Sequence, residues 1–547
     1  MTAPRITPAT LKDWLHDGAE LALCDVREAG QFGESHLLHA VPLPYSRLEL
    51  DAPRLLPNRR VRLVLCDDGS GGSGGTGSVA DRAAARLAAL GYRPQVLAGG
   101  TAAWAAAGFA LFAGVNVPSK TFGELVEHRC HTPRVTPDRL AAWQAEGRDL
   151  VVVDGRPFAE YRKMNIPGAV CCPNGELALR IDALAPRPDT TIVVNCAGRT
   201  RSLIGAQTLI DLGLPNPVYA LENGTQGWVL AERALEHGSA WRYPDDAHPA
   251  DPEARRHQAR RLARRWGVGR LDGPRAAALL ADPGRSTFLC DVRSPEEFAA
   301  GTLPGAQSAP GGQLIQATDQ YVGVRRARLV LFDDDGIRAP VVAAWLARLG
   351  FEAWVLAGVE ATAGGGLAAP GFTPVAPPVA DPPALPTIAP PAVQERLDRG
   401  ALLLDLRPSM AHRRGRIPGS LWTIRPRLAA LPLAGRALVL VADDPAVAAL
   451  AADEARSLGA ASVELLAGGT AAWEAAGHPL VPSPALPADA DCIDYLFFVH
   501  DRHDGNREAA RRYLAWETGL VAQLDARERA ELDACAAPAE AEEEPAP

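Results

Sequence analysis

The sequence predicts an α/β protein built from four tandem three-layer α/β/α modules, each with a central parallel sheet, followed by a helical C-terminal tail. Three observations lead to this fold class. A strand-like apolar run ending in Asp-x-Arg occurs four times, a second apolar run follows each copy, and an Ala/Leu-rich segment follows each second run. Repetition of one such unit indicates tandem modules. Alternating strands and helices imply right-handed crossovers with helices on both faces of each sheet.

The first repeated element surrounds Asp25, Asp154, Asp291 and Asp405, in the segments LCDVREAGQF, VVDGRPFAEY, LCDVRSPEEF and LLDLRPSMAH. Fourteen residues after each Asp stands His39, Gly168, Gly305 or Gly419, so the strand-to-turn geometry is expected to be rigid. Every copy keeps Asp-x-Arg. We therefore interpret Arg156 as one half of an ion pair that holds the fold, rather than as a catalytic group.

The second run reads RLVLCDD, TIVVNCAG, RLVLFDDD and ALVLVADD, which is typical of strands buried on both faces of a parallel sheet. The helix predicted behind each run ends at a glycine, which favours a glycine C-cap: Gly91, Gly213, Gly350 and Gly459. A third strand leads to LAGGTAAW, LENGTQGW and LAGGTAAW in the first, second and fourth copies. The third copy keeps only LAGV.

These elements predict modules at residues 1–115, 120–240, 267–373 and 385–483, with a helical tail at 484–547 that has an acidic, disordered end. The segment Pro374–Pro391 is expected to be an extended, proline-rich linker. Arg255–Arg265 is expected to be a basic helical connector, and we favour a solvated linker over a binding patch.

Composition excludes several classes of protein. The 547 residues carry a net charge of −9, which argues against a nucleic-acid binder. Nine scattered cysteines form neither a disulfide framework nor a zinc motif, so a reduced, cytoplasmic setting fits best. The start lacks the apolar segment of a secretory signal, and no apolar run is long enough for a membrane span, so no membrane partner is expected.

The candidate chemistry lies at the end of each second strand, where parallel α/β sheets place their sites. Counting 42 residues from the repeat Asp leads to Asp67, Cys196 and Asp333, and the shorter fourth copy offers Ala442 or Asp443. Only Cys196 is a thiol at this corner. The loop that follows it is expected to cradle an anion: Ala197, Gly198, Arg199, Thr200, Arg201 and Ser202.

The position of Cys196 favours a nucleophile. A helix N-terminus, its unpaired N–H groups and two arginines are each expected to lower the thiol pKa. The other thiols are interpreted as small buried hydrophobes, because a cysteine on a strand usually packs in the core: Cys24, Cys66 and Cys290. The same interpretation is favoured for Cys171 and Cys172, with a resolving thiol as the alternative.

Taken together, these motifs resemble the rhodanese family over nearly all of residues 1–483. The features that carry the resemblance are Asp-x-Arg, the Pro-Gly-Ala turn, CAGRTRS and the Leu-x-x-Gly-x-x-x-Trp closure. The resemblance implies that Cys196 accepts sulfane sulfur from a thiosulfate-like donor or a low-molecular-weight persulfide. The persulfide would pass its sulfur to cyanide, a thiol or a protein acceptor, without a metal or cofactor. The other three modules resemble inactive members.

Several alternatives remain open. Two-domain rhodaneses pair an inactive with an active module, so modules one and two are expected to pair, and modules three and four likewise. Related phosphatases use a loop one residue longer than the four residues between Cys196 and Arg201, so a phosphatase or arsenate reductase is less favoured. A non-enzymatic scaffold or a sulfur-carrier docking protein is the main rival, because three modules lack the thiol.

Secondary candidates complete the site prediction. Glu176 and Arg180 lie one helical turn apart and would either bind substrate or form a surface ion pair. Asn223, with Gly224 and Thr225, is expected to shape the pocket. The tail cluster of His500, Asp501, His503 and Asp504 has ligand chemistry, although packing and helix capping are favoured over a metal site or a docking role.

Overall fold

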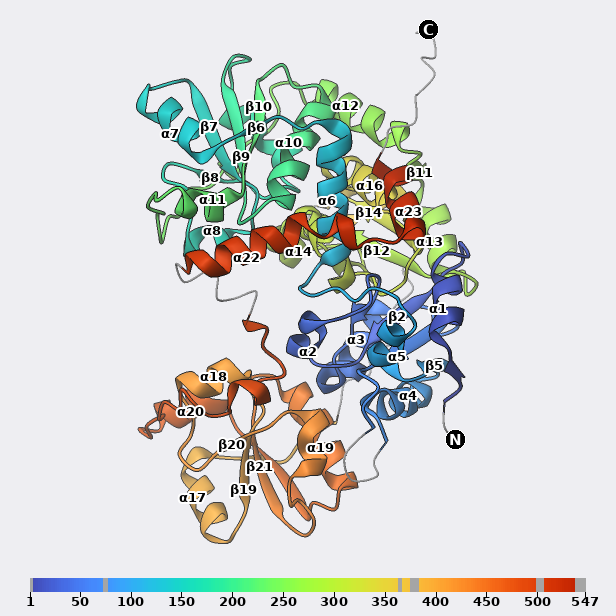
Figure 1. Cartoon of the computed structure of the whole chain (residues 1–547), viewed down its shortest axis with the longest axis vertical. Coiled ribbons are helices and arrows are strands. Elements are labelled where there is room, and N and C mark those ends of the chain that lie inside the picture. Colours follow the sequence, from blue (N-terminus) through green and yellow to red (C-terminus); the bar gives the residue numbers. More distant parts are fainter. Residues whose placement is uncertain (1–2, 72–76, 363–365, 374–382, 498–505, 537–547) are drawn as a thin grey trace. The chain divides into compact units, whose positions relative to one another are not determined.

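Four five-stranded sheets with the same strand order form the protein in a computed structural model, which describes residues 3–71, 77–362, 366–373, 383–497 and 506–536 (Figure 1). The order in the first sheet is β1-β5-β4-β2-β3, and its counterparts are β6-β10-β9-β7-β8, β11-β15-β14-β12-β13 and β18-β22-β21-β19-β20. The paired strands of these four sheets run parallel, as the crossover helices require. The predicted fold class is confirmed, and each sheet lies inside one of the four predicted residue ranges.

Module one begins with a helix whose N-cap, Thr7, accepts the backbone N–H of Thr10. Its elements are β1 (Arg5–Ile6), α1 (Pro8–Leu15), β2 (Ala22–Asp25), α2 (Ala29–Glu34), β3 (Val41–Pro42), a 3₁₀ turn η1 (Tyr45–Arg47), α3 (Leu48–Leu55), β4 (Leu63–Cys66), α4 (Val79–Ala89), β5 (Pro94–Leu97) and α5 (Gly100–Ala106). Helix α6 (Val117–Cys130) then leads to module two.

In module two, packing on both faces of the sheet explains why the strand sequences are continuous apolar runs. Its elements are β6 (Arg134–Val135), α7 (Pro137–Ala145), β7 (Leu150–Asp154), α8 (Phe158–Lys163), β8 (Val170–Cys171), α9 (Leu177–Leu184), β9 (Thr191–Asn195), α10 (Thr200–Leu212), β10 (Val218–Leu221) and α11 (Gly224–Leu230). On β9, Val193 packs with Trp143 of α7 on one face, whereas Ile192 and Val194 pack with Leu209 of α10 on the other. Helices therefore cover both faces.

Module three follows the connector helix α12 (Pro252–Arg265). Its elements are β11 (Gly269–Leu271), α13 (Gly273–Ala281), β12 (Thr287–Asp291), α14 (Pro295–Ala300), β13 (Gln307–Ser308), α15 (Gly311–Gln316), η3 (Thr318–Gln320), β14 (Arg328–Phe332), α16 (Arg338–Arg348), β15 (Glu352–Leu356) and a small antiparallel pair, β16 (Glu360–Ala361) and β17 (Leu367–Ala368). This hairpin stands where the other modules carry a final helix.

Module four and the tail complete the chain. Their elements are β18 (Thr387–Ile388), α17 (Pro390–Asp398), β19 (Leu402–Asp405), α18 (Ser409–Arg414), β20 (Leu421–Trp422), η4 (Arg425–Ala430), β21 (Ala437–Val441), α19 (Pro445–Ser457), β22 (Ser462–Leu466), α20 (Gly469–Ala475), η5 (Asp489–Asp491), α22 (Arg507–Thr518), η7 (Val521–Gln523) and α23 (Ala526–Ala536). The predicted linker is shorter than expected, because Thr387–Ile388 pairs in the sheet and Pro390 starts a helix.

The predicted helix ends are confirmed at all four glycines. Gly91, Gly213, Gly350 and Gly459 have φ values between +83° and +90°, a region that other residues enter only with strain. None of the helices in the described ranges combines the length and apolar character needed to cross a lipid bilayer.

The modules pair differently from the prediction. One compact unit contains Met1–Asp17, Leu21–Gly114 and Pro377–Phe497, and thus modules one and four. The other contains Gly18–Glu20, Val115–Ala376 and Phe498–Pro547, and thus modules two and three with the end of the tail. The expected pairing of consecutive modules one with two and three with four is therefore wrong.

Specific polar contacts explain each pairing. In the first unit, Arg425 binds Glu49 at 2.6 and 2.8 Å, and the Tyr45 hydroxyl donates to Glu454 at 2.7 Å. In the second unit, Arg338 binds Glu176 at 2.9 Å, and the Trp345 indole N–H donates to Thr208 at 2.9 Å. These partners lie far apart in the sequence, so no local pattern reveals them.

The connector helix α12 belongs to the second unit. Ala259 and Leu262 are buried, and Arg255 binds Asp182 of module two at 2.6 Å. The expectation of a solvated linker is wrong for this apolar side, which packs against α16 and α9. The opposite side keeps several arginines exposed.

Candidate functional site

The Asp-x-Arg motif forms the same buried ion pair in all four modules. In module two, Arg156 donates to both carboxylate oxygens of Asp154 at 2.8 and 2.7 Å and to the Met164 carbonyl at 2.6 Å. Burial lowers the pKa of Arg156, but the charge of Asp154 raises it to a net increase. The equivalent pairs are Asp25–Arg27, Asp291–Arg293 and Asp405–Arg407. The structural interpretation of this motif agrees with its geometry.

The residue directly after each second long strand distinguishes module two from modules one and three. After β14, the carboxyl group of Asp333 accepts N–H bonds from Gly336, Ile337 and Ala339 at 3.0, 3.1 and 2.8 Å. After β4, Asp67 accepts from Gly69 at 2.9 Å and Ala80 at 3.0 Å. In these two modules a side chain of the protein itself occupies the backbone donors of the loop.

Module two places Cys196 at this corner, and its loop has no such internal acceptor. Across the described chain, the six backbone N–H groups of residues 197–202 donate no hydrogen bond to another protein group. Helix α10 begins at Thr200, so part of this set is the unpaired start of a helix. Cys196 is only 2% exposed. A thiol and a row of free donors thus share one loop, which is the arrangement expected of an anion cradle.

A tight turn from α11 holds the loop from behind. Cys196 offers its carbonyl to the Thr225 N–H at 2.8 Å, and Ala197 accepts from the Gln226 side chain at 3.0 Å. Gly224 has a φ of +53°, and a Cβ atom on it would lie 2.2 Å from the Cys196 carbonyl oxygen. Only glycine fits this approach, so the turn fixes the position of the cysteine backbone.

The two loop arginines are paired with carboxylates. Arg199 binds Glu124 of α6 at 2.7 and 2.9 Å and also contacts Glu127. Arg201 binds Glu160 of α8 at 2.9 and 2.8 Å. Three carboxylates therefore offset the positive charge that the sequence predicts beside the thiol.

Arg201 keeps an electrostatic link to the thiol. Burial lowers the pKa of Arg201, whereas Glu160 and, more weakly, Cys196 raise it to a net increase. The charge of Arg201 thus interacts with the sulfur.

A cavity of about 370 Å³ opens at this loop and draws its walls from the whole second unit. Lys120 of α6, Gln313 and Gln316 of module three, and Tyr513 and Glu517 of the tail helix α22 line it with Cys196. Glu517 accepts from the Thr200 hydroxyl at 2.8 Å and lies 3.5 Å from the Lys120 ammonium. The sequence analysis missed these residues, because only tertiary structure brings them to the loop.

Two of the predicted substrate-binding residues lie elsewhere. Glu176 and Arg180 are buried, and Glu176 joins both Arg180 at 3.3 Å and Arg338 of module three. Neither is among the described residues that line the cavity at Cys196. Their placement as pocket residues or as a surface pair is corrected, because they form a buried ion pair in which Glu176 also contacts module three and Arg180 donates to the Asp245 and Ala247 carbonyls.

Asn223 supports the loop rather than the cavity. It has a φ of +59°, and its side-chain oxygen accepts from Arg199 at 3.3 Å. With Gly224 and Thr225 it forms the turn behind Cys196, and it is not among the described residues that line the cavity, where a pocket or substrate-binding residue was expected.

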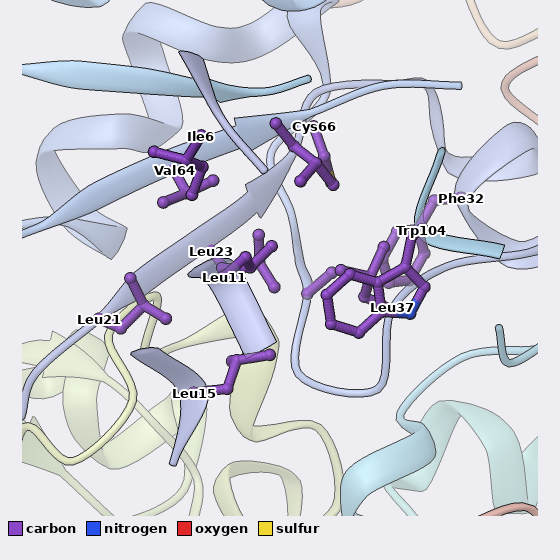
Figure 2. Close-up of a cluster of buried hydrophobic side chains, with 12 residues drawn as sticks. Ile6, Leu11, Leu15, Leu21, Leu23, Phe32, Leu37, Val64, Cys66 and Trp104 are labelled. Carbon is purple, nitrogen blue, oxygen red and sulfur yellow. The ribbon is translucent and has the colours of Figure 1, made fainter. Parts of the chain in front are cut away.

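The remaining predicted thiols are packed in the protein interior. Cys66 is the last residue of β4 and belongs to the core of module one (Figure 2). Burial raises the pKa of Cys24, Cys171 and Cys290 to about 12, and raises those of Cys66 and Cys172 well above the ordinary value. A thiol with a raised pKa is a poor nucleophile, which argues against a resolving role for Cys171 or Cys172. The cluster of His500, Asp501, His503 and Asp504 lies outside the described residues.

The fold and the site define a class of protein with tandem parallel α/β modules, one of which carries a cysteine directly after its second long strand. Comparison with known proteins identifies the family. The model of the rhodanese-like domain matches residues 7–107, 136–231 and 274–359. The chain belongs to the rhodanese family. Module four lies outside these matches but has the same strand order.

A solved structure with high similarity over nearly the whole chain agrees with this assignment. A thiosulfate sulfurtransferase from Pseudomonas aeruginosa is 42% identical, with a TM-score of 0.87, over 96% of this chain and 99% of that chain. SseA from Escherichia coli, a 3-mercaptopyruvate sulfotransferase, is 20% identical with a TM-score of 0.21, over 41% of this chain and 97% of that chain. Among curated proteins, no significant match was found.

Proposed function

We propose that this protein is a sulfurtransferase that carries sulfane sulfur as a persulfide on Cys196. The main support is a difference between the residues that directly follow the second long strand of each module. Asp67 and Asp333 accept hydrogen bonds from backbone N–H groups of their own loops, whereas the N–H groups beside Cys196 have no acceptor in the described chain. A bound sulfur anion would supply that acceptor. The 42% identity to a thiosulfate sulfurtransferase supports sulfurtransferase activity in general and thiosulfate as one donor.

The reaction consists of two displacements at sulfur. The Cys196 thiolate attacks the outer sulfur of thiosulfate, a new S–S bond forms, the S–S bond of thiosulfate breaks, and sulfite leaves with the electron pair. The loop N–H groups stabilise the resulting persulfide anion. Cyanide or a thiolate then attacks the outer sulfur, the S–S bond to Cys196 breaks, and the thiolate returns. Neither displacement requires a metal or an organic cofactor.

The surroundings of Cys196 support this assignment of roles. Arg201 supplies a positive charge coupled to the sulfur, and Lys120 is one of several further basic residues that line the cavity. A low-molecular-weight persulfide as donor and a protein thiol as acceptor belong to the same proposal. A reducing, cytoplasmic setting also belongs to it, in keeping with the cysteines of the described chain, which are free thiols.

Intact-protein mass spectrometry tests the proposal directly. Wild type, Cys196→Ser and the matched control Cys66→Ser are incubated with thiosulfate and then with cyanide. Wild type and Cys66→Ser are expected to gain one sulfur atom that cyanide removes, and Cys196→Ser to gain none. Absence of the gain with both thiosulfate and glutathione persulfide would reject the transferase and leave a docking scaffold.

A further inference from the structure

In the described part of module three, no closing helix stands where the other modules place one against their corner loop. In modules one and two, the start of that helix donates to the corner carbonyl, from Thr101 to Asp67 and from Thr225 to Cys196, both at 2.8 Å. Module four keeps the helix as α20. In module three, β15 instead continues into the β16–β17 hairpin. The sequence shows the same loss, since LAGV ends where the others read on to Thr and Trp.

A cavity of about 540 Å³ lies at this place. It is lined by the loop 333–336, the segment 355–359 and one side of α12. The carboxyl ends of β14 and β15 thus border it, as the equivalent ends border the Cys196 site in module two. Ligands of open α/β sheets bind at this edge, and the volume lies in the range of sites for organic molecules.

Four arginines and four carboxylates line the cavity, and the arginines lie together on one side of it. Arg256, Arg260 and Arg264 stand four residues apart on α12, so they share one face over about 12 Å. Arg270 of β11 adds a fourth guanidinium. Within the described ranges, the guanidinium groups of Arg260, Arg264 and Arg270 form no ion pair and no hydrogen bond. The guanidinium of Arg256 binds Glu253 at 2.5 Å and the Asp335 carbonyl at 2.7 Å.

The three carboxylates of the loop reduce the positive potential of the cavity, but each is bound to groups other than Arg260, Arg264 and Arg270. Asp333 accepts the loop N–H groups, and Asp334 and Asp335 bind Arg338 at 3.1 and 2.6 Å. The remaining wall is apolar and includes Val268, Val355, Val359 and Pro340. Three unpaired guanidiniums beside an apolar wall suit a ligand with a ring and several negative charges.

We propose that this cavity is a binding site for a nucleoside diphosphate or a related organic diphosphate, separate from the Cys196 site. One guanidinium group binds two phosphate oxygens at once, and several arginines in a row along a helix match consecutive phosphates. The base or another flat apolar group packs on the valines. The cavity lies where the other modules carry a closing helix, and α12, the connector between modules two and three, supplies three of its arginines.

Isothermal titration calorimetry of the full chain with ADP, inorganic pyrophosphate and adenosine tests this site. ADP is expected to bind saturably and more weakly as salt rises, pyrophosphate to bind less tightly, and adenosine least tightly. Arg260→Ser and Arg264→Ser are each expected to weaken ADP binding about tenfold. Arg261→Ser is the matched control, since Arg261 is exposed on the same helix and does not line the cavity.

The outcomes separate this site from the proposed catalysis. Cys196→Ser is expected to bind ADP as wild type does, and Arg264→Ser to keep the wild-type rate of sulfur transfer. Absence of saturable ADP binding, or an equal loss in Arg261→Ser, would overturn the site. Pyrophosphate binding as tightly as ADP would overturn the role of the apolar wall.

Discussion

Replacing Gly224 by alanine perturbs the Cys196 loop from behind without touching the thiol. The new Cβ would lie 2.2 Å from the Cys196 carbonyl oxygen and 2.8 Å from that of Gly198, whereas ordinary contacts begin near 3.4 Å. The cysteine backbone would have to move by about 1 Å, and a displacement of that size at a reacting centre costs about 100-fold in rate. Alanine at a φ of +53° adds about 1 kcal/mol of strain, and overpacking adds about 1–3 kcal/mol.

Gly469→Ala in module four provides the matched control. Gly469 occupies the same motif position with a φ of +57°, but its Cβ would lie 3.3 Å from the Ala442 carbonyl oxygen, so little movement is required. Steady-state transfer from thiosulfate to cyanide and thermal unfolding are measured for both variants. We expect a fall in kcat of about 100-fold for Gly224→Ala and the wild-type kcat for Gly469→Ala. A Gly224→Ala enzyme with wild-type kcat would refute the argument that this turn positions the cysteine.

Three further predictions concern charges in the second unit. Arg338→Ala leaves Glu176 buried without this partner and should lower the free energy of unfolding, measured in urea, by about 3–5 kcal/mol. The double variant with Glu176→Gln should recover part of this loss, and full stability of the single variant would contradict the prediction. Burial raises the pKa of Glu297, but Arg338 lowers it to about 2. The ionised carboxylate therefore stabilises the folded state fully above its ordinary pKa near 4.5, and this stabilisation is lost as the pH falls from about 5 to 2. Because Glu297 is partly exposed, Glu297→Gln should remove only about 1–2 kcal/mol of that acid dependence, measured by urea unfolding at each pH, and an unchanged pH curve would count against the ion pair. Glu517→Gln removes a negative charge beside Thr200 in the cavity and should lower the KM for thiosulfate about threefold to tenfold at unchanged kcat, whereas a raised KM would show that the carboxylate assists binding.

Local patterns were sufficient for the fold and for the corner position of Cys196. The spacing of 42 residues from the repeat Asp leads directly to the residue after β4, β9 and β14, because strands and crossovers of equal length repeat the same geometry. The glycine C-caps were predictable for the same reason, since their signal lies within one helical turn.

Contacts between distant segments could not be predicted in this way. The spacing of Glu176 and Arg180 correctly indicates an ion pair, but the third partner, Arg338, comes from another module and turns a predicted pocket into a buried contact. The pairing of Arg199 with two carboxylates was not predictable either, because Glu124 and Glu127 lie on α6, in a segment that carries no repeat motif. Side-chain complementarity between modules decides both outcomes, and a single sequence does not record it.

The contact between Thr200 and Glu517 has a consequence for the folding of the protein during translation. The loop that carries Cys196 is synthesised first, and the helix that completes its cavity emerges more than 300 residues later. Modules that fold in order from the N-terminus would therefore hold a finished loop with an open side for most of synthesis. Helix α22 would then close the cavity at Cys196, so a chain interrupted before this helix would carry the thiol without its complete enclosure.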